Sequence, residues 1–198
     1  MNINRIRALV AKAMPATVHA HCDTADGPAV TDGRRALETG NVNYALKWIP
    51  ADGEVELRQA FEKAQQIRPL GEAAAELADH LFLETLVRLH RLAEGVGFTG
   101  IQPSGIAIDP VVVAADAALT SGSTADLLPL VPEDRRAELD RRFSTALALG
   151  EFEVDDVDAG RRYLAAYVDF FKFAEGEDHE HHGHDQLAHS AHGNSCGH

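Results

Sequence analysis

Four side chains that commonly ligate transition metals lie within a stretch of six residues near the start of the chain. They are His21, Cys22, Asp23 and Asp26. An imidazole nitrogen, a thiolate and carboxylate oxygens form a donor set that Zn²⁺, Ni²⁺ and Cu²⁺ accept in proteins. The spacing therefore predicts a specific metal site. The alternative interpretation is structural, with Cys22 as a small buried apolar residue and Asp23 or Asp26 as the N-cap of the next helix.

A second concentration of imidazoles lies at the other end of the chain, in residues 177–198. Seven of the eleven histidines are here, including His179, His181, His182 and His184. The tract has no apolar periodicity, so we expect it to be disordered. Neutral imidazoles at high local concentration bind Ni²⁺, Zn²⁺ or Cu²⁺ with little selectivity. This tail is predicted to be an auxiliary metal reservoir, and the alternative is a solubilising tail with incidental affinity.

His80 and Glu84 are a third pair of candidate ligands, in a helix predicted over residues 71–93. Residues four apart share a helix face, so these two side chains can act as neighbouring ligands for the same metal as the N-terminal segment. Arg88 continues the face, and the alternative is a solvated surface on which Glu84 pairs with Arg88. We expect His90 to lie off this face, in the core or between helices.

Apolar residues recur at helical spacing along most of the chain, and strand signals are nearly absent. In the helix predicted over residues 71–93, Leu77, Leu81, Leu89 and Leu92 stand at helical spacing, and Phe82 and Leu86 widen this apolar face. Proline followed by a terminal glycine marks the start and end of several helices. These patterns predict an all-α fold.

The second half of the sequence repeats the first at an offset of 82 positions. Helix-starting prolines, helix-ending glycines and core residues all recur in order. Pro28, Gly40, Pro50, Leu57 and Phe61 correspond to Pro110, Gly122, Pro132, Leu139 and Phe143. We therefore predict a helical bundle built from two tandem copies of one helical unit, paired about a pseudo-two-fold axis.

Five segments follow from this organisation. Residues 1–20 are a leader or propeptide, 21–95 the first helical repeat with the candidate metal site, 96–108 a glycine-rich connector, 109–176 the second repeat, and 177–198 the disordered histidine-rich tail. The leader is basic, but its apolar patch is too short for a secretory signal. A cytoplasmic location is favoured, and export after N-terminal processing is the alternative.

Composition excludes some partners and bounds others. The formal net charge of −13 would repel a nucleic-acid backbone, so no nucleic-acid partner is expected. No run approaches the roughly 18 apolar residues of a membrane span. An apolar content of 45% is sufficient for a sizeable core. Cys22 and Cys196 are too few for a disulfide framework.

Four segments resemble an uncharacterised prokaryotic family, a domain of unknown function. They read Ala-His-Cys-Asp-Thr at 20–24, Asp-Gly-Pro at 26–28, Ala-Leu-Glu-Thr-Gly-Asn-Val-Asn at 36–43 and Glu-Thr-Leu-Val-Arg-Leu-His-Arg at 84–91. The likeness extends over about residues 20–175. It implies a helical fold and no assigned activity.

The N-terminal segment also resembles the hook of nickel superoxide dismutase, whose mature chain begins His-Cys-Asp-x-Pro-Cys-Gly after a propeptide is removed. The matching residues are His21, Cys22, Asp23 and Gly27. This resemblance implies cleavage before His21, which would expose its α-amine as a further ligand. Asp26 stands where the hook has its second cysteine, and Ala25 stands where it has proline. One thiolate and one carboxylate suit metal binding better than redox cycling.

The sequence thus predicts a soluble protein that handles, stores or delivers Ni, Zn or Cu, with a His-Cys-Asp site and a histidine-rich tail. A metalloenzyme related to the nickel-hook dismutases is one alternative. A helical protein-interaction module without a specific metal site is another. Expected partners are the metal ion itself and either a second copy of the chain or a metal-receiving protein.

Overall fold

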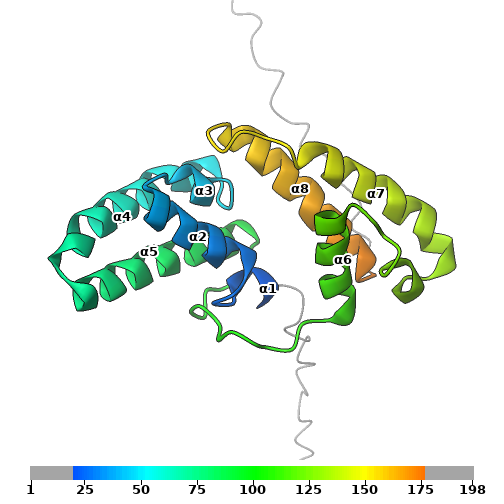
Figure 1. Ribbon diagram of the computed structural model, residues 1–198, viewed down its shortest axis with the longest axis horizontal. Coiled ribbons are helices and arrows are strands. Elements are labelled where there is room, and N and C mark those ends of the chain that lie inside the picture. Colours follow the sequence, from blue (N-terminus) through cyan, green and yellow to red (C-terminus); the bar gives the residue numbers. More distant parts are fainter. Residues whose placement is uncertain (1–19, 177–198) are drawn as a thin grey trace, which may run out of the picture.

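The computed structural model describes residues 20–176, and its regular elements in this range are helices (Figure 1). The all-α prediction is confirmed. The first half contains α1 (Ala20–Asp23), α2 (Pro28–Thr39), α3 (Asn43–Leu46), α4 (Glu54–Ile67) and α5 (Glu72–Ala93). The second half contains α6 (Pro110–Ser121), α7 (Arg136–Leu149) and α8 (Val157–Ala174). Short 3₁₀ turns occupy Ala51–Gly53, Arg68–Leu70, Leu128–Leu130 and Glu133–Arg135.

The helices form two groups joined by the segment between α5 and α6 (Figure 1). In the first group α4 and α5 pack against each other, and α2 packs on α5. In the second group α7 and α8 pack together, with α6 against α8. The predicted disorder of the tail concerns residues 177–198, which lie outside the described range. No helix within residues 20–176 combines the length and apolar character needed to cross a membrane.

Proline and glycine bound α2 and α6 as the sequence predicts. Each helix has proline at its first position, and each ends at a glycine in the left-handed region, Gly40 with φ 72° and Gly122 with φ 73°. The Asp109 side chain caps α6 by accepting a hydrogen bond from the Val111 N–H at 2.8 Å. The N-cap of α2 is Gly27, without a side-chain cap. The alternative that Asp23 or Asp26 caps this helix is therefore wrong.

Helix bounds in the two halves correspond at the predicted offset. Adding 82 to the first and last residue numbers of α2 gives those of α6, and the same addition to α4 gives those of α7. The core residues also correspond, since Leu57 and Leu139 are fully buried, and Phe61 and Phe143 are each 9% exposed. Equal bounds and equal burial are what a tandem repeat requires. That the halves are copies of one unit stays a prediction.

The buried face of α5 differs from the prediction. Phe82, Leu86 and Leu89 of the predicted apolar face are buried, whereas Leu77, Leu81 and Leu92 are 70%, 55% and 67% exposed. The buried residues are Ala78, Phe82, Leu83, Leu86, Val87, Leu89 and His90. Both faces carry leucines at helical spacing, so periodicity cannot select between them. The contacts of α5 with α2 and α4 decide which face is covered.

Arg161 joins the second helical group to the first. Its Nη2 lies 2.6 Å from Glu54 Oε1, and its Nε donates to the Ile49 carbonyl at 3.1 Å. Asp155 adds a second link by accepting hydrogen bonds from the side-chain amides of Asn41 and Asn43, at 3.0 and 2.9 Å. These contacts cross between residues more than 100 positions apart, and they hold the two groups in a defined orientation.

The crossing of α2 and α5 depends on Gly33, which provides our first prediction. A Cβ atom there would lie 2.6 Å from Leu83 Cδ2 and 2.8 Å from Leu86 Cδ2. Both leucines are buried, so they have little room to move. Gly33→Val should lower the free energy of unfolding by about 2 kcal/mol, measured by urea denaturation followed by circular dichroism. Gly97→Val is the matched control because nothing lies within 4 Å of that site. Equal urea midpoints for the two variants would contradict the crossing described here.

Candidate functional site

The predicted metal motif lies in and just after α1. Cys22 and Asp23 are both buried, at 4% exposure. The side chain of His21 lies outside the described part of the chain. The connector holds this segment in place, because the Gln102 N–H donates to the Asp23 carbonyl at 2.9 Å and the Ala25 N–H donates to the Gln102 carbonyl at 2.8 Å. A segment without regular structure thus fixes the backbone of the motif.

The C-terminal turn of α5 faces α1 with three polar side chains. Arg91 Nε lies 3.0 Å from Asp23 Oδ2, and Arg91 Nη1 lies 3.8 Å from Glu94 Oε2. His90 Nε2 is 3.7 Å from Glu94 Oε1. Together with Cys22, these residues form what we call the buried polar cluster: Cys22, Asp23, His90, Arg91 and Glu94. The cluster brings a thiol, an imidazole and two carboxylates to one place.

Burial controls the protonation of the cluster. It raises the pKa of the Asp23 carboxyl from 3.8 to about 6, while the Arg91 guanidinium acts in the opposite direction. Burial also raises the pKa of the Cys22 thiol, and the Glu94 carboxylate raises it further. The thiol is therefore protonated near neutral pH. A metal that bound this sulfur would have to displace its proton.

A backbone contact orients the ring of His90. Its Nδ1 lies 2.9 Å from the Trp48 carbonyl oxygen. A carbonyl oxygen only accepts hydrogen bonds, so Nδ1 donates to it and carries a proton. Nε2 is buried and faces Glu94 Oε1 at 3.7 Å, but it makes no hydrogen bond within residues 20–176. Asp23 Oδ1 likewise makes no hydrogen bond there. The cluster therefore contains a nitrogen and an oxygen donor that the described side chains leave unsatisfied.

The other predicted ligands lie elsewhere. His80 and Glu84 pair with each other at 3.4 Å on the exposed side of α5. At 1.5 Å of rise per residue, His80 is about 15 Å from His90 along the helix, so it does not reach α1. Asp26 is exposed and accepts a hydrogen bond from the Gly105 N–H at 3.2 Å. His179, His181, His182 and His184 lie outside the described residues.

The structure therefore places different partners beside the motif from those that the sequence suggested. His90 is buried between helices, as predicted. His90 and Glu94 are the residues of α5 that lie beside the motif, whereas the sequence predicted His80 and Glu84 as the additional ligands. The sequence does carry one signal, a histidine and a glutamate four residues apart at the end of a helix. Among the side chains that the structure describes, no three of His, Cys, Asp or Glu are arranged to hold a metal ion. A complete site would thus need a donor from outside them.

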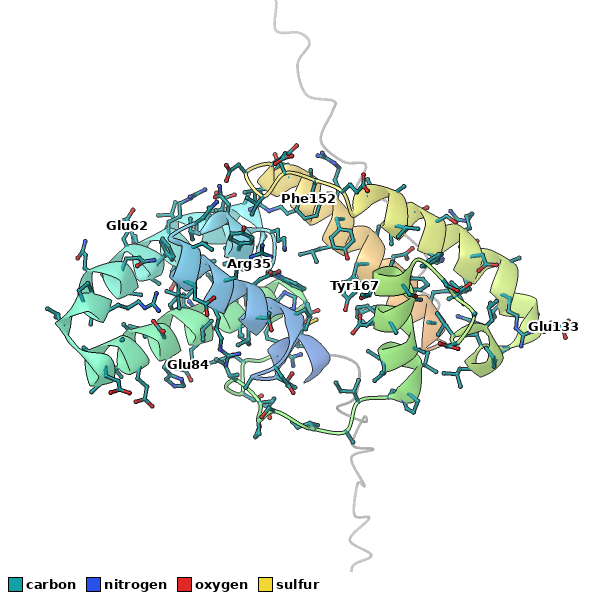
Figure 2. All side chains as sticks on the ribbon, viewed as in Figure 1. Arg35, Glu62, Glu84, Glu133, Phe152 and Tyr167 are labelled. Carbon is teal, nitrogen blue, oxygen red and sulfur yellow. The ribbon has the colours of Figure 1, made fainter. Side chains whose placement is uncertain are left out.

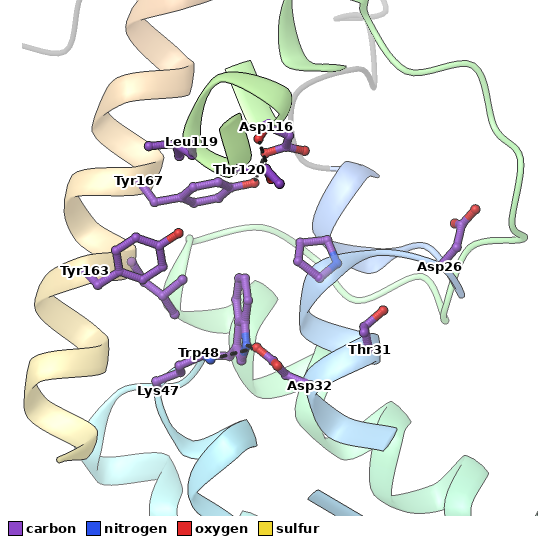
Figure 3. A pocket seen from close by; sticks show the side chains of 12 residues that line it. Asp26, Thr31, Asp32, Lys47, Trp48, Asp116, Leu119, Thr120, Tyr163 and Tyr167 are labelled. Carbon is purple, nitrogen blue, oxygen red and sulfur yellow. Dashed lines mark hydrogen bonds and ion pairs between the residues drawn. The ribbon is translucent and has the colours of Figure 1, made fainter. Parts of the chain in front are cut away.

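A cavity of about 590 Å³ lies between the two helical groups (Figure 3). Its walls come from α2, α6, α8 and the segment after α3, and they include Asp32, Lys47, Trp48, Asp116, Tyr163 and Tyr167. The Tyr167 hydroxyl donates to Asp116 Oδ1 at 2.7 Å. In the view of all side chains, Tyr167 projects from the second group toward the first (Figure 2).

Trp48 connects the cavity to the buried polar cluster. Its indole N–H donates to Asp32 Oδ2 at 2.8 Å at the cavity wall, and Lys47 Nζ lies 2.8 Å from the same oxygen. Its carbonyl oxygen accepts the hydrogen bond from His90. Sequence reasoning missed the cavity because its walls come from both halves. Only the packing of the two groups brings Asp116 opposite Asp32.

The chain belongs to DUF6448, a family of unknown function, whose sequence profile matches residues 26–173. The expectation of an uncharacterised family is confirmed. No curated protein and no solved structure matches the chain. The family match begins after Asp23, so it covers the helical body and leaves the function of the N-terminal motif to be argued from its own geometry.

The raised pKa of Asp23 provides our second prediction. Between pH 3.8 and about 6 the folded state holds this proton more tightly than the unfolded state, so the contribution of Asp23 to stability falls as pH rises. The shift corresponds to roughly 3 kcal/mol. The free energy of unfolding of the wild type, relative to that of Asp23→Asn, should fall by up to this amount between about pH 4 and 7. Urea denaturation in the presence of a chelator measures both free energies. The exposed Asp134→Asn is the control. A difference between wild type and Asp23→Asn that does not change with pH would contradict this account.

Proposed function

We propose that this protein binds a transition-metal ion where α1 meets the C-terminal turn of α5, and that its histidine-rich tail collects the same ions. The observation that carries the proposal is the orientation of His90. Its Nδ1 donates to the Trp48 carbonyl, and its buried Nε2 makes no hydrogen bond within residues 20–176 and faces Glu94 Oε1 at 3.7 Å. Metal-ligating histidines are typically held in this way, with the second ring nitrogen donating to a carbonyl or carboxylate.

The chemistry of the donors indicates which metals are suitable. Cys22 offers sulfur, His90 nitrogen, and Asp23 and Glu94 oxygen, a mixed set that suits Zn²⁺, Ni²⁺ or Cu²⁺ better than Mg²⁺ or Ca²⁺. His21 is the neighbouring residue from which a further donor would come, through its imidazole or, after cleavage before it, through its α-amine. Loss of the Cys22 proton on binding would make the affinity fall at low pH.

Storage or delivery of metal is the form of this function that we propose. The motif contains one cysteine, and a single thiolate in a mostly nitrogen and oxygen set stabilises a divalent ion without favouring redox cycling. The tail adds seven histidines, and neutral imidazoles at high local concentration are suited to the exchange of ions. The motif would then hold one ion tightly, while the tail supplies or removes ions.

Metal content of matched variants is our third prediction. Full-length protein and a chain ending at Gly176 would be loaded with Zn²⁺ or Ni²⁺, desalted and measured by mass spectrometry, with the mature N-terminus recorded. The shorter chain should retain stoichiometric metal. Cys22→Ser and His90→Gln should each weaken binding at least about tenfold, because each removes a ligand. His80→Gln is the matched control, a histidine of the same helix on its exposed side.

Cobalt substitution gives an independent readout. Co²⁺ bound through Cys22 should show a thiolate charge-transfer band that disappears in Cys22→Ser and persists in His80→Gln. If the chain ending at Gly176 binds no metal, any binding by the full-length protein belongs to the tail, and the specific site is refuted. Equal binding by His90→Gln and His80→Gln would refute the role of His90.

A further inference from the structure

The cavity between the two helical groups has the volume of a small-molecule site. Its volume is about 590 Å³, within the roughly 300–1,000 Å³ that is usual for ligand pockets. Residues of α2, α6, α8 and the segment after α3 line it, so it forms only where the two groups pack together. Arg161 holds that packing by pairing with Glu54. A molecule bound in the cavity would therefore contact both groups at once.

The ionic groups of the cavity wall are engaged by the protein itself. Lys47 Nζ lies 2.8 Å from Asp32 Oδ2. Asp116 accepts a hydrogen bond from the Tyr167 hydroxyl at 2.7 Å, and Asp26 accepts one from a backbone N–H of the connector at 3.2 Å. An ion that entered would give up its hydration without meeting an unengaged counter-charge among these groups, whereas a neutral molecule gives up much less. The wall therefore favours an uncharged ligand.

The lining of the cavity includes three aromatic side chains. Figure 3 shows the rings of Tyr163 and Tyr167 projecting from α8 and the indole of Trp48 between the two groups. Trp48 and Tyr167 are buried, and Tyr163, which is half-buried, is the most exposed of the three. Leu119 and Leu164 add aliphatic surface. Aromatic molecules pack on such rings in offset or edge-to-face arrangements, which gain free energy beyond the apolar area that they bury.

The Tyr163 hydroxyl is a polar group of the wall that the fold does not use. In Figure 3 it points away from α8 into the space between the two groups, and it makes no hydrogen bond within residues 20–176. The corresponding residue of the first half is Phe82, which is fully buried and packs without a hydroxyl. Burial raises the pKa of the Tyr163 phenol, and the nearby carboxylates of Asp116 and Asp32 raise it further. The phenol is therefore neutral and can both donate and accept a hydrogen bond.

We propose that this cavity binds a small uncharged aromatic molecule that carries a hydrogen-bonding group. Its ring would pack against Tyr163 and Trp48, and its polar group would form a hydrogen bond with the Tyr163 hydroxyl. A site that offers such a group discriminates against molecules without a partner for it, because the group is then left unpaired. The site is separate from the metal site proposed above, and it requires neither His90 nor Cys22.

Our fourth prediction uses p-cresol as the probe, with p-methylbenzylamine and p-toluate as its cationic and anionic counterparts of similar shape. Trp48 is the single tryptophan of the chain, so its indole N–H gives one identifiable nuclear magnetic resonance signal from the cavity wall. Isotopically labelled full-length protein would be titrated in a chelator at constant ionic strength. p-Cresol should shift this signal saturably, with a Kd on the order of 1 mM, and each charged counterpart should bind at least about tenfold more weakly.

A substitution that removes one oxygen atom tests the hydrogen bond to the ligand. Tyr163→Phe keeps the ring and removes the hydroxyl, so p-cresol should bind about fivefold more weakly. Toluene, which has no hydroxyl, should bind equally to the variant and the wild type. The urea midpoint should also be unchanged, because this hydroxyl makes no hydrogen bond within residues 20–176. Tyr44→Phe is the matched control, since the Tyr44 ring packs against Arg35 and does not line the cavity.

The titrations can also overturn the proposal. Binding of p-methylbenzylamine or p-toluate as tight as that of p-cresol would refute selection of an uncharged ligand, and no shift with p-cresol would refute the site. Equal affinity of Tyr163→Phe and Tyr44→Phe for p-cresol, or equal weakening of p-cresol and toluene by Tyr163→Phe, would refute the hydrogen bond. If Tyr163→Phe fails to fold, the order of affinity of the three probes for the wild type decides.

Discussion

The contact between His90 and the Trp48 carbonyl links the parts of this molecule that carry its polar chemistry. It joins the end of α5 to the segment after α3, and it lies beside the buried ion pair of Arg91 with Asp23. Buried charges are tolerated only when they are paired, so Arg91 fixes where α1 lies against α5. Because the Trp48 indole lines the cavity, the position of α1 and the shape of the cavity depend on the same few contacts.

The polar groups described above lie at positions where the two halves differ. In the last helix of each half the offset is 81 positions, so His90 corresponds to Phe171 and Leu86 corresponds to Tyr167. Phe171 is buried in an apolar environment, whereas His90 is buried against a carbonyl and a carboxylate. Similarly, exposed His80 corresponds to Arg161, which pairs with Glu54 and so joins the two helical groups. Residues of the same type in both halves form the helix ends and the core. Positions that differ between the halves provide the buried polar cluster, Arg161 and part of the cavity wall.

Two polar regions lie close together in this small protein. The buried polar cluster contains a thiol, an imidazole and two carboxylates, and the cavity is lined by aromatic rings and carboxylates. Trp48 takes part in both, through its carbonyl on one side and its indole on the other. A structural role for the motif and a binding role for it are compatible, since the same Arg91 that anchors Asp23 also neutralises charge beside Cys22.

The sequence by itself determined the helical class, the main helix boundaries and the internal correspondence of the halves. These properties depend on local signals, such as proline and glycine at the ends of α2 and α6 and apolar periodicity within α4 and α7. It also identified Cys22 and Asp23 as residues of interest, because unusual types at short spacing are visible without a structure.

Only the tertiary structure decided which side of α5 is buried, which residues stand beside Cys22 and where a cavity forms. Leucines on both faces of α5 satisfy the same periodicity, and the packing of α2 and α4 selects one of them. Asp23 and Arg91 are 68 residues apart in sequence, and Asp32 and Asp116 are 84 apart, so no local pattern relates either pair. Their proximity follows from how helices pack and from the requirement that buried charges be paired, which are properties of the folded chain as a whole.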